Sequence, residues 1–91
     1  MAPGRILFTM SKAEKIFEKV MTGRSDANIS FEDVCNLLLR LGFALRRQGT
    51  SHHIYSLGDS YLNLQPGSGG KAKKYQVRQV REELKRINLR P

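Results

Sequence analysis

Between residues 43 and 65 the chain shows one pattern three times: a short segment of alternating apolar and polar side chains, followed by a break that contains glycine or proline. Alternation with a period of two is typical of β-strands that have one face buried. Connections this short join only antiparallel neighbours, because a parallel crossover needs about a dozen residues. We therefore predict an antiparallel meander with strands at 43–48, 52–57 and 61–65.

Apolar residues with helical spacing flank these strands on both sides. Ser11 followed by Glu14 is a capping box, an arrangement that begins helices, and Ser30 followed by Asp33 is a similar cap. These signals predict an α+β fold of the order α-α-β-β-β-α, in which a three-stranded antiparallel sheet packs on helices and keeps one face open to solvent. The expected helices span about 11–22, 30–41 and 75–87.

A length of 91 residues leaves room for one small domain. We expect residues 1–10 to form a flexible leader and residues 11–91 to form this domain. The longest apolar run, Leu37–Leu39, is far shorter than the roughly 18–20 residues of a membrane span, so no membrane association is expected. Cys35 is the only cysteine, which excludes a disulfide framework, and an unpaired thiol among leucines suits the cytoplasm.

The formal net charge of +8 comes entirely from the C-terminal part of the chain. Residues 1–39 contain five basic and five acidic residues, whereas residues 40–91 contain eleven basic and three acidic residues. A basic field confined to one part of a small fold favours a polyanionic partner, nucleic acid above all, although a basic surface can also serve solubility alone. The basic residues expected to bind phosphate around the start of the last helix are Lys71, Lys73, Lys74, Arg78 and Arg81.

Strand parity divides the side chains of the predicted sheet between two faces. If Phe43, Tyr55 and Leu62 point toward the helices, His53 lies at the edge of the core and His52 points to the open face. The open face should then carry Arg46, Gln48, His52, Ile54, Ser56, Tyr61, Asn63 and Gln65, while Leu45, Leu57 and Leu64 face the helices.

Few kinds of chemistry fit such a surface. Adjacent strand histidines cannot bind one metal ion together, and Cys35 completes no zinc set, so we expect no metal. The glycines at 67–70 lack the strand-to-helix context of a nucleotide-binding loop, and we expect no cofactor. One imidazole beside a phosphate-binding surface suffices for RNA cleavage through the substrate's own 2′-hydroxyl. The residue pattern alone favours the plainer alternative of a structural histidine.

The segment 49–55, Gly-Thr-Ser-His-His-Ile-Tyr, resembles the G-S-H-H-x-[FY] signature of the HicA toxins, which are small bacterial mRNA interferases of type II toxin–antitoxin systems. The resemblance covers about residues 30–85 and includes the Leu-Gly-Phe entry into the first strand at 41–43, Leu-Gln-Pro at 64–66 and the segment 73–80. It implies a double-stranded-RNA-binding-domain-like fold of the order α-β-β-β-α, which leaves the helix at 11–22 as an extension.

For this chain the resemblance implies a metal-independent endoribonuclease that cleaves mRNA, with His52 as the catalytic general acid or base and an acidic HicB-type antitoxin as its inhibitor. Thr50 is an extra residue relative to the signature, and residues 67–69 lack the histidine that some members carry there. A non-catalytic RNA-binding module of similar fold is the alternative. The residues expected to bind substrate are Arg46, Ser51, Tyr61, Asn63, Lys71, Lys73, Lys74 and Arg78.

Overall fold

The computed structural model describes residues 10–49 and 51–91 and has the predicted order of helices and strands. The predicted flexible leader, residues 1–10, lies outside the described residues apart from Met10, as does Thr50. None of the helices in the described ranges is long and apolar enough to cross a membrane. The elements are α1 (Lys12–Thr22), η2 (Asp26–Asn28), α2 (Phe31–Arg40), β1 (Ala44–Gln48), β2 (His53–Leu57), β3 (Ser60–Leu64), η3 (Ser68–Gly70) and α3 (Lys74–Arg86).

Both predicted capping serines begin a helix. Ser11 Oγ accepts a hydrogen bond from the Glu14 backbone N–H at 3.1 Å, and the Glu14 carboxylate accepts one from the Ser11 N–H at 2.7 Å. Ser30 Oγ accepts a hydrogen bond from the Asp33 backbone N–H at 3.0 Å. Gly23 ends α1 with a φ of 74°, a left-handed conformation that strains other residues. Local sequence therefore sets these helix boundaries, as predicted.

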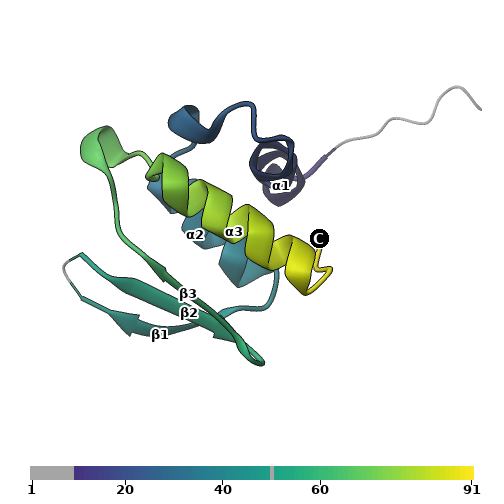
Figure 1. Ribbon diagram of the computed structural model, residues 1–91, viewed down its shortest axis with the longest axis vertical. Coiled ribbons are helices and arrows are strands. Elements are labelled where there is room, and N and C mark those ends of the chain that lie inside the picture. The colour runs from purple at the N-terminus through teal and green to yellow at the C-terminus, as the bar shows by residue number, and fades with distance from the viewer. Residues whose placement is uncertain (1–9, 50) are drawn as a thin grey trace, which may run out of the picture.

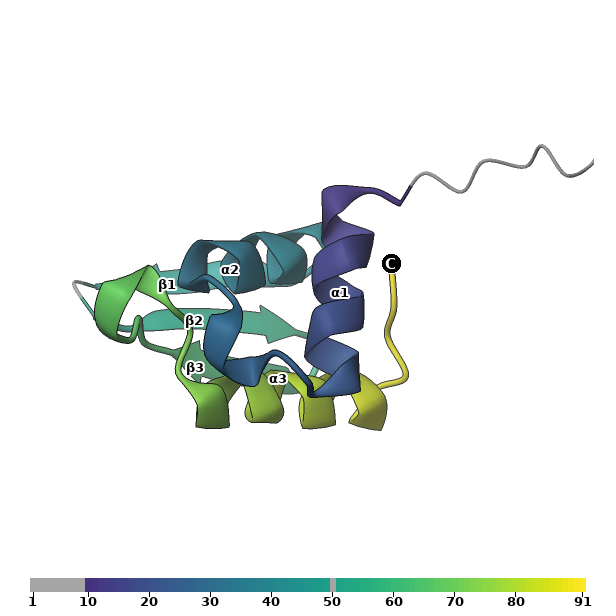
Figure 2. The same cartoon turned by 90° about the horizontal axis from the view of Figure 1, so that it is seen from above.

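The helices form two layers on one side of the sheet. α2 and α3 lie along one face of the sheet, and α1 crosses them on the side away from it (Figure 1, Figure 2). The strand order is β1-β2-β3, and both pairs are antiparallel. Among the described residues, no helix covers the opposite face of the sheet, so that face is open as predicted. The core between the layers includes Ile16, Val20, Val34, Leu38, Tyr55, Leu62, Leu64, Val77, Val80 and Leu84.

A β-bulge in β1 changes which arginine belongs to the open face. The register pairs Leu45 with Tyr55 and Arg47 with Ile54, so Arg46 is the extra residue between them. Cross-strand partners share a face of the sheet. Arg47 therefore takes the open-face position beside Ile54 that simple alternation assigned to Arg46.

Two other side chains of β1 also differ from the prediction. Gln48 pairs with His53 on the helix-facing side, so its expected place on the open face is wrong. Leu45 shares a face with the buried Tyr55 but is 37% exposed. β1 is an edge strand with solvent along one side, and all of its residues are exposed. Its side chains contribute little to the core.

Arg81 joins the helical layers instead of the basic surface. Its guanidinium donates two hydrogen bonds to the Asp26 carboxylate, at 3.0 and 3.1 Å, and a third to the Val20 carbonyl at 2.8 Å. The side chains of Arg81 and Asp26 are only 13% and 19% exposed. The prediction that Arg81 belongs to the phosphate-binding cluster is therefore wrong, because the side chain fastens α1 and η2 to α3.

Candidate active site

His52 lies immediately before β2 and has an exposed side chain. The register places Ile54 of β2 between Arg47 of β1 and Asn63 of β3, so one hollow receives side chains from all three strands. The sheet thus brings a cation, an imidazole and an amide together. The hollow is lined by Arg47, Gly49, Ser51, His52, Ile54 and Asn63.

Asn63 contacts the His52 ring through its amide oxygen. The distance between His52 Nδ1 and Asn63 Oδ1 is 3.2 Å. An amide oxygen only accepts hydrogen bonds, so in the neutral imidazole this contact favours the tautomer with the ring proton on Nδ1. In that tautomer the other ring nitrogen, Nε2, is the one that can accept a proton.

Gln65 and Lys73 extend the polar contacts of His52 toward α3. The Gln65 Nε2 atom lies 3.4 Å from both ring nitrogens of His52, and Lys73 Nζ donates to Gln65 Oε1 at 3.2 Å. With Nδ1 protonated, the Gln65 amide has only the imidazole Nε2 to donate to, and the long distance makes this contact weak. A substrate group can therefore displace Gln65 from Nε2, and Lys73 brings a positive charge close to that point.

His53 has a different environment from His52, as strand parity predicts. Its ring packs edge-on against Phe31, with 5.0 Å between ring centroids. Its Nδ1 is buried and has no hydrogen-bond partner. His53 is therefore a packing residue at the edge of the core.

A buried glutamine holds the part of β3 that contacts His52. Gln76 of α3 is 6% exposed. Its Oε1 accepts a hydrogen bond from the Gln65 backbone N–H at 2.9 Å, and its Nε2 donates to the Asn63 backbone carbonyl at 3.4 Å. β3 is an edge strand, so the Gln76 amide takes the place of a neighbouring strand. One side chain thus fixes the backbone of both residues that contact His52.

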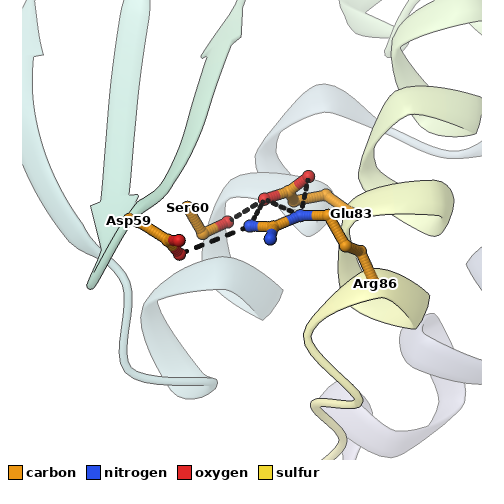
Figure 3. A network of polar contacts seen from close by, with 4 residues as sticks. All are labelled: Asp59, Ser60, Glu83 and Arg86. Atoms are coloured by element: carbon orange, nitrogen blue, oxygen red, sulfur yellow. Dashed lines mark hydrogen bonds and ion pairs between the residues drawn. The ribbon is translucent and has the colours of Figure 1, made fainter.

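The opposite end of β3 is joined to α3 by a network of charged groups (Figure 3). Ser60 Oγ donates to Glu83 Oε2 at 2.6 Å, and Arg86 Nη2 donates to the same oxygen at 2.7 Å. Arg86 also lies 3.4 Å from Asp59. Hydrogen bonds from Arg86 and Ser60 lower the pKa of Glu83. β3 is therefore fixed to α3 at both ends.

A second hollow lies between β3 and α3 and borders the first at Asn63, which lines both. Both Tyr61 and Arg78, which the sequence predicts to bind substrate, line this second hollow. The other lining residues are Leu62, Tyr75, Gln79, Glu82, Glu83 and Arg86.

The predicted lysines surround the start of α3. Lys73 is the N-cap residue and Lys74 is the first residue of the helix, which has no acidic residue in its first turn and no side-chain cap. A helix N-terminus favours negative charge, so lysines at this position do not stabilise the helix itself. They do add positive charge to a helix end that already favours an anionic ligand. Lys71 is exposed and its backbone forms a bridge with Ser30. In the described part of the chain, Lys71 and Arg46 neither line the His52 hollow nor form a hydrogen bond with His52.

Sequence reasoning missed four residues of this region. Arg47 was missed because the bulge shifts the register, and Gln65 was placed on the open face without a role. Tyr75 and Gln76 lie on a helix whose pairing with β3 no local pattern indicates. The one available signal was the position of Gln76 in the helix, where a polar residue stands directly beside the buried Val77.

Other residue types that often carry chemistry lie in the core or apart from one another. Burial raises the pKa of Cys35 and of its neighbour Tyr55, so both groups favour their protonated forms. Within residues 10–49 and 51–91, no three His, Cys, Asp or Glu side chains lie close enough to hold a metal ion together. His52 is thus the group best placed for chemistry on the open face.

A three-stranded antiparallel sheet backed by helices on one face, with the exposed His52 beside it, defines a small α+β protein whose order of elements is compatible with a double-stranded-RNA-binding-domain-like fold. The family model for the HicA toxin of bacterial toxin–antitoxin systems matches residues 31–89, well over half of the chain. The chain belongs to the HicA toxin family and is thus related to the toxins of these systems. α1 and η2 lie outside the matched residues. No curated protein and no solved structure matches the chain.

Proposed function

We propose that this toxin is an mRNA interferase, a metal-independent endoribonuclease in which His52 transfers the proton. The observation that carries the proposal is the exposed imidazole whose Nδ1 lies 3.2 Å from Asn63 Oδ1, so that Nε2, held only by the long Gln65 contact of 3.4 Å, can meet a substrate. A neutral imidazole in this tautomer is a suitable general base near neutral pH. Family membership supports the toxin role, and mRNA in the cytoplasm is the proposed target.

In the proposed reaction the substrate supplies its own nucleophile. His52 Nε2 takes the proton of a ribose 2′-hydroxyl while that oxygen attacks the adjacent phosphorus. The bond from phosphorus to the 5′-oxygen breaks, and the departing oxygen takes a proton from solvent. The products are a 2′,3′-cyclic phosphate and a 5′-hydroxyl, and the imidazolium then returns its proton to solvent.

Cations near His52 support this chemistry. Arg47 lines the same hollow as His52, and Lys73 donates a hydrogen bond to Gln65, which contacts the His52 ring. Positive charge at this point stabilises the charge that builds up on phosphorus in the transition state. Ser51 lines the hollow beside His52 and is proposed to contact the same phosphate. Further from the ring, Arg46, Lys71, Lys74 and Arg78 are proposed to bind the flanking phosphates of a single strand.

An RNA that lacks the nucleophile tests the proposal. A 2′-O-methyl oligonucleotide keeps the charge and bases of RNA but has no 2′-hydroxyl. We expect unmodified RNA to be cleaved to fragments ending in a cyclic phosphate and the methylated strand to stay intact. Cleavage of the methylated strand would contradict the mechanism. Binding of unmodified RNA without cleavage would contradict the activity and favour the RNA-binding module.

We further propose that an acidic HicB-type antitoxin restrains the toxin by covering the open face. The net charge of +8 attracts an acidic protein, and the exposed His52 is accessible to one. Diethyl pyrocarbonate modifies accessible imidazoles, so the antitoxin encoded by the neighbouring gene should protect His52 once the two proteins are co-purified. Unchanged modification of His52 in the complex would contradict inhibition by occlusion.

A further inference from the structure

The hollow between β3 and α3 holds two exposed aromatic rings that the proposed chemistry leaves unused. Four large apolar side chains are exposed among the described residues, and two of them line this hollow: Tyr61 at 61% and Tyr75 at 52%. Exposed apolar surface gathered in one place is typical of a binding site. The two rings come from different elements, so the fold brings them together.

We propose that this hollow binds a nucleobase of single-stranded RNA next to the bond that is cleaved. This proposal rests on the proposed RNA substrate. Tyrosine rings stack on bases, and the Arg78 guanidinium beside them adds a cation for the same base or its phosphate. The hollow has a volume of about 720 Å³, which lies within the usual range of ligand sites.

The position of the hollow links it to His52. Asn63 lines both hollows, so a base held between β3 and α3 belongs to a nucleotide close to the one that meets the imidazole. The exposed Gln79 and Glu82 line the same hollow and offer an amide and a carboxylate to the polar edge of a base.

Two features favour a base of a single strand over other occupants. The two carboxylates that line the hollow, Glu82 and Glu83, are balanced by Arg78 and Arg86, so the hollow offers no net charge to attract an acidic protein but accepts a neutral base. Bases within a duplex are already stacked and paired, so only an unpaired base is free to lie between these side chains.

Binding of two RNAs by an inactive protein tests the proposal. The probes are a short unstructured RNA and the same strand with abasic nucleotides, measured by fluorescence anisotropy on the His52→Ala protein. Tyr61→Leu and Tyr75→Leu should each weaken binding of the intact RNA roughly 5- to 150-fold, the usual effect of losing one stacked base. Binding of the abasic RNA should not change.

Matched variants separate stacking from other effects. Tyr61→Phe and Tyr75→Phe keep the rings and should bind as the parent does. Leu39→Ala removes an exposed apolar side chain of α2, which lines neither hollow, and should have no effect. Circular dichroism confirms that each variant is folded.

Equal losses on both RNAs, or no loss on either, would overturn the nucleobase site. If unsubstituted protein cleaves RNA while the tyrosine variants bind normally, the nucleobase site fails and the proposed function stands. If the unsubstituted protein binds neither RNA, both fail. Loss of antitoxin binding with unchanged RNA affinity would assign the hollow to a protein partner and overturn the proposal.

Discussion

Replacing Gln76 with methionine tests whether α3 fixes the geometry of His52. Methionine has a similar volume, so no cavity forms, but it cannot bond the backbone of β3. The Gln65 N–H loses a 2.9 Å hydrogen bond, which costs about 1–3 kcal/mol for a partly buried donor. The Asn63 carbonyl loses a 3.4 Å contact, which adds about 0.5 kcal/mol. We expect the free energy of unfolding to fall by about 1.5–3.5 kcal/mol, within the roughly 5–14 kcal/mol of a domain this size.

Ser60→Ala is the matched control for Gln76→Met. It removes the 2.6 Å hydrogen bond to Glu83 at the other end of β3, and a bond to a charged group contributes about 1.5–3 kcal/mol. Both variants therefore weaken the junction of β3 with α3 by a similar amount. Only Gln76→Met loosens Asn63 and Gln65, the two residues that contact His52.

The two variants should differ in cleavage. Gln76→Met should cleave RNA about 10- to 100-fold more slowly, because small displacements of a catalytic group have effects of this size. Ser60→Ala should stay close to the wild-type rate. Denaturant titration gives the stability, and single-turnover cleavage is measured where both variants are folded. Equal rates for the two variants would refute a positioning role for Gln76.

Three further predictions concern residues around the site. Arg81→Ala should lower the free energy of unfolding by about 2–4 kcal/mol because it leaves the Asp26 carboxylate partly buried and unpaired, and it should not change RNA affinity. Arg78→Ala should leave the free energy of unfolding unchanged but weaken RNA binding and reduce its salt slope by about 0.7. The lowered pKa of Glu83 means that its ionised form stabilises the fold at neutral pH. That contribution is lost as pH falls through the lowered value, so Glu83→Gln should flatten the acid side of a stability profile; an unchanged profile would contradict it. His53→Ala should lower stability by about 1 kcal/mol through lost packing on Phe31 and leave cleavage near the wild-type rate.

Much of the fold was predictable because its signals are local. The Ser11 and Ser30 caps, the glycine turns and the alternating strands each act within a few residues. Parity also separated His52 from His53, because cross-strand geometry is regular in β2 and β3. The family resemblance then suggested His52 as the catalytic residue.

The remaining features depend on contacts between distant segments. The bulge at Arg46 has no signal in the alternation, so Arg47 was overlooked. Arg81 was assigned to the surface because its partner, Asp26, is far away in the sequence. Gln76 and Tyr75 acquire their roles only when α3 lies along β3. The positions of Arg47, Tyr75 and Gln76 in the site therefore depend on tertiary packing and not on a local sequence pattern.

Single-turnover cleavage of labelled RNA in the presence of EDTA tests the central claim most directly. We predict that the unsubstituted protein and His53→Ala cleave at similar rates with EDTA present. His52→Ala should be slower by about 10²- to 10⁴-fold, the usual cost of losing a positioned acid–base group, while still binding RNA. Full activity of His52→Ala, or loss of wild-type activity in EDTA, would contradict the account.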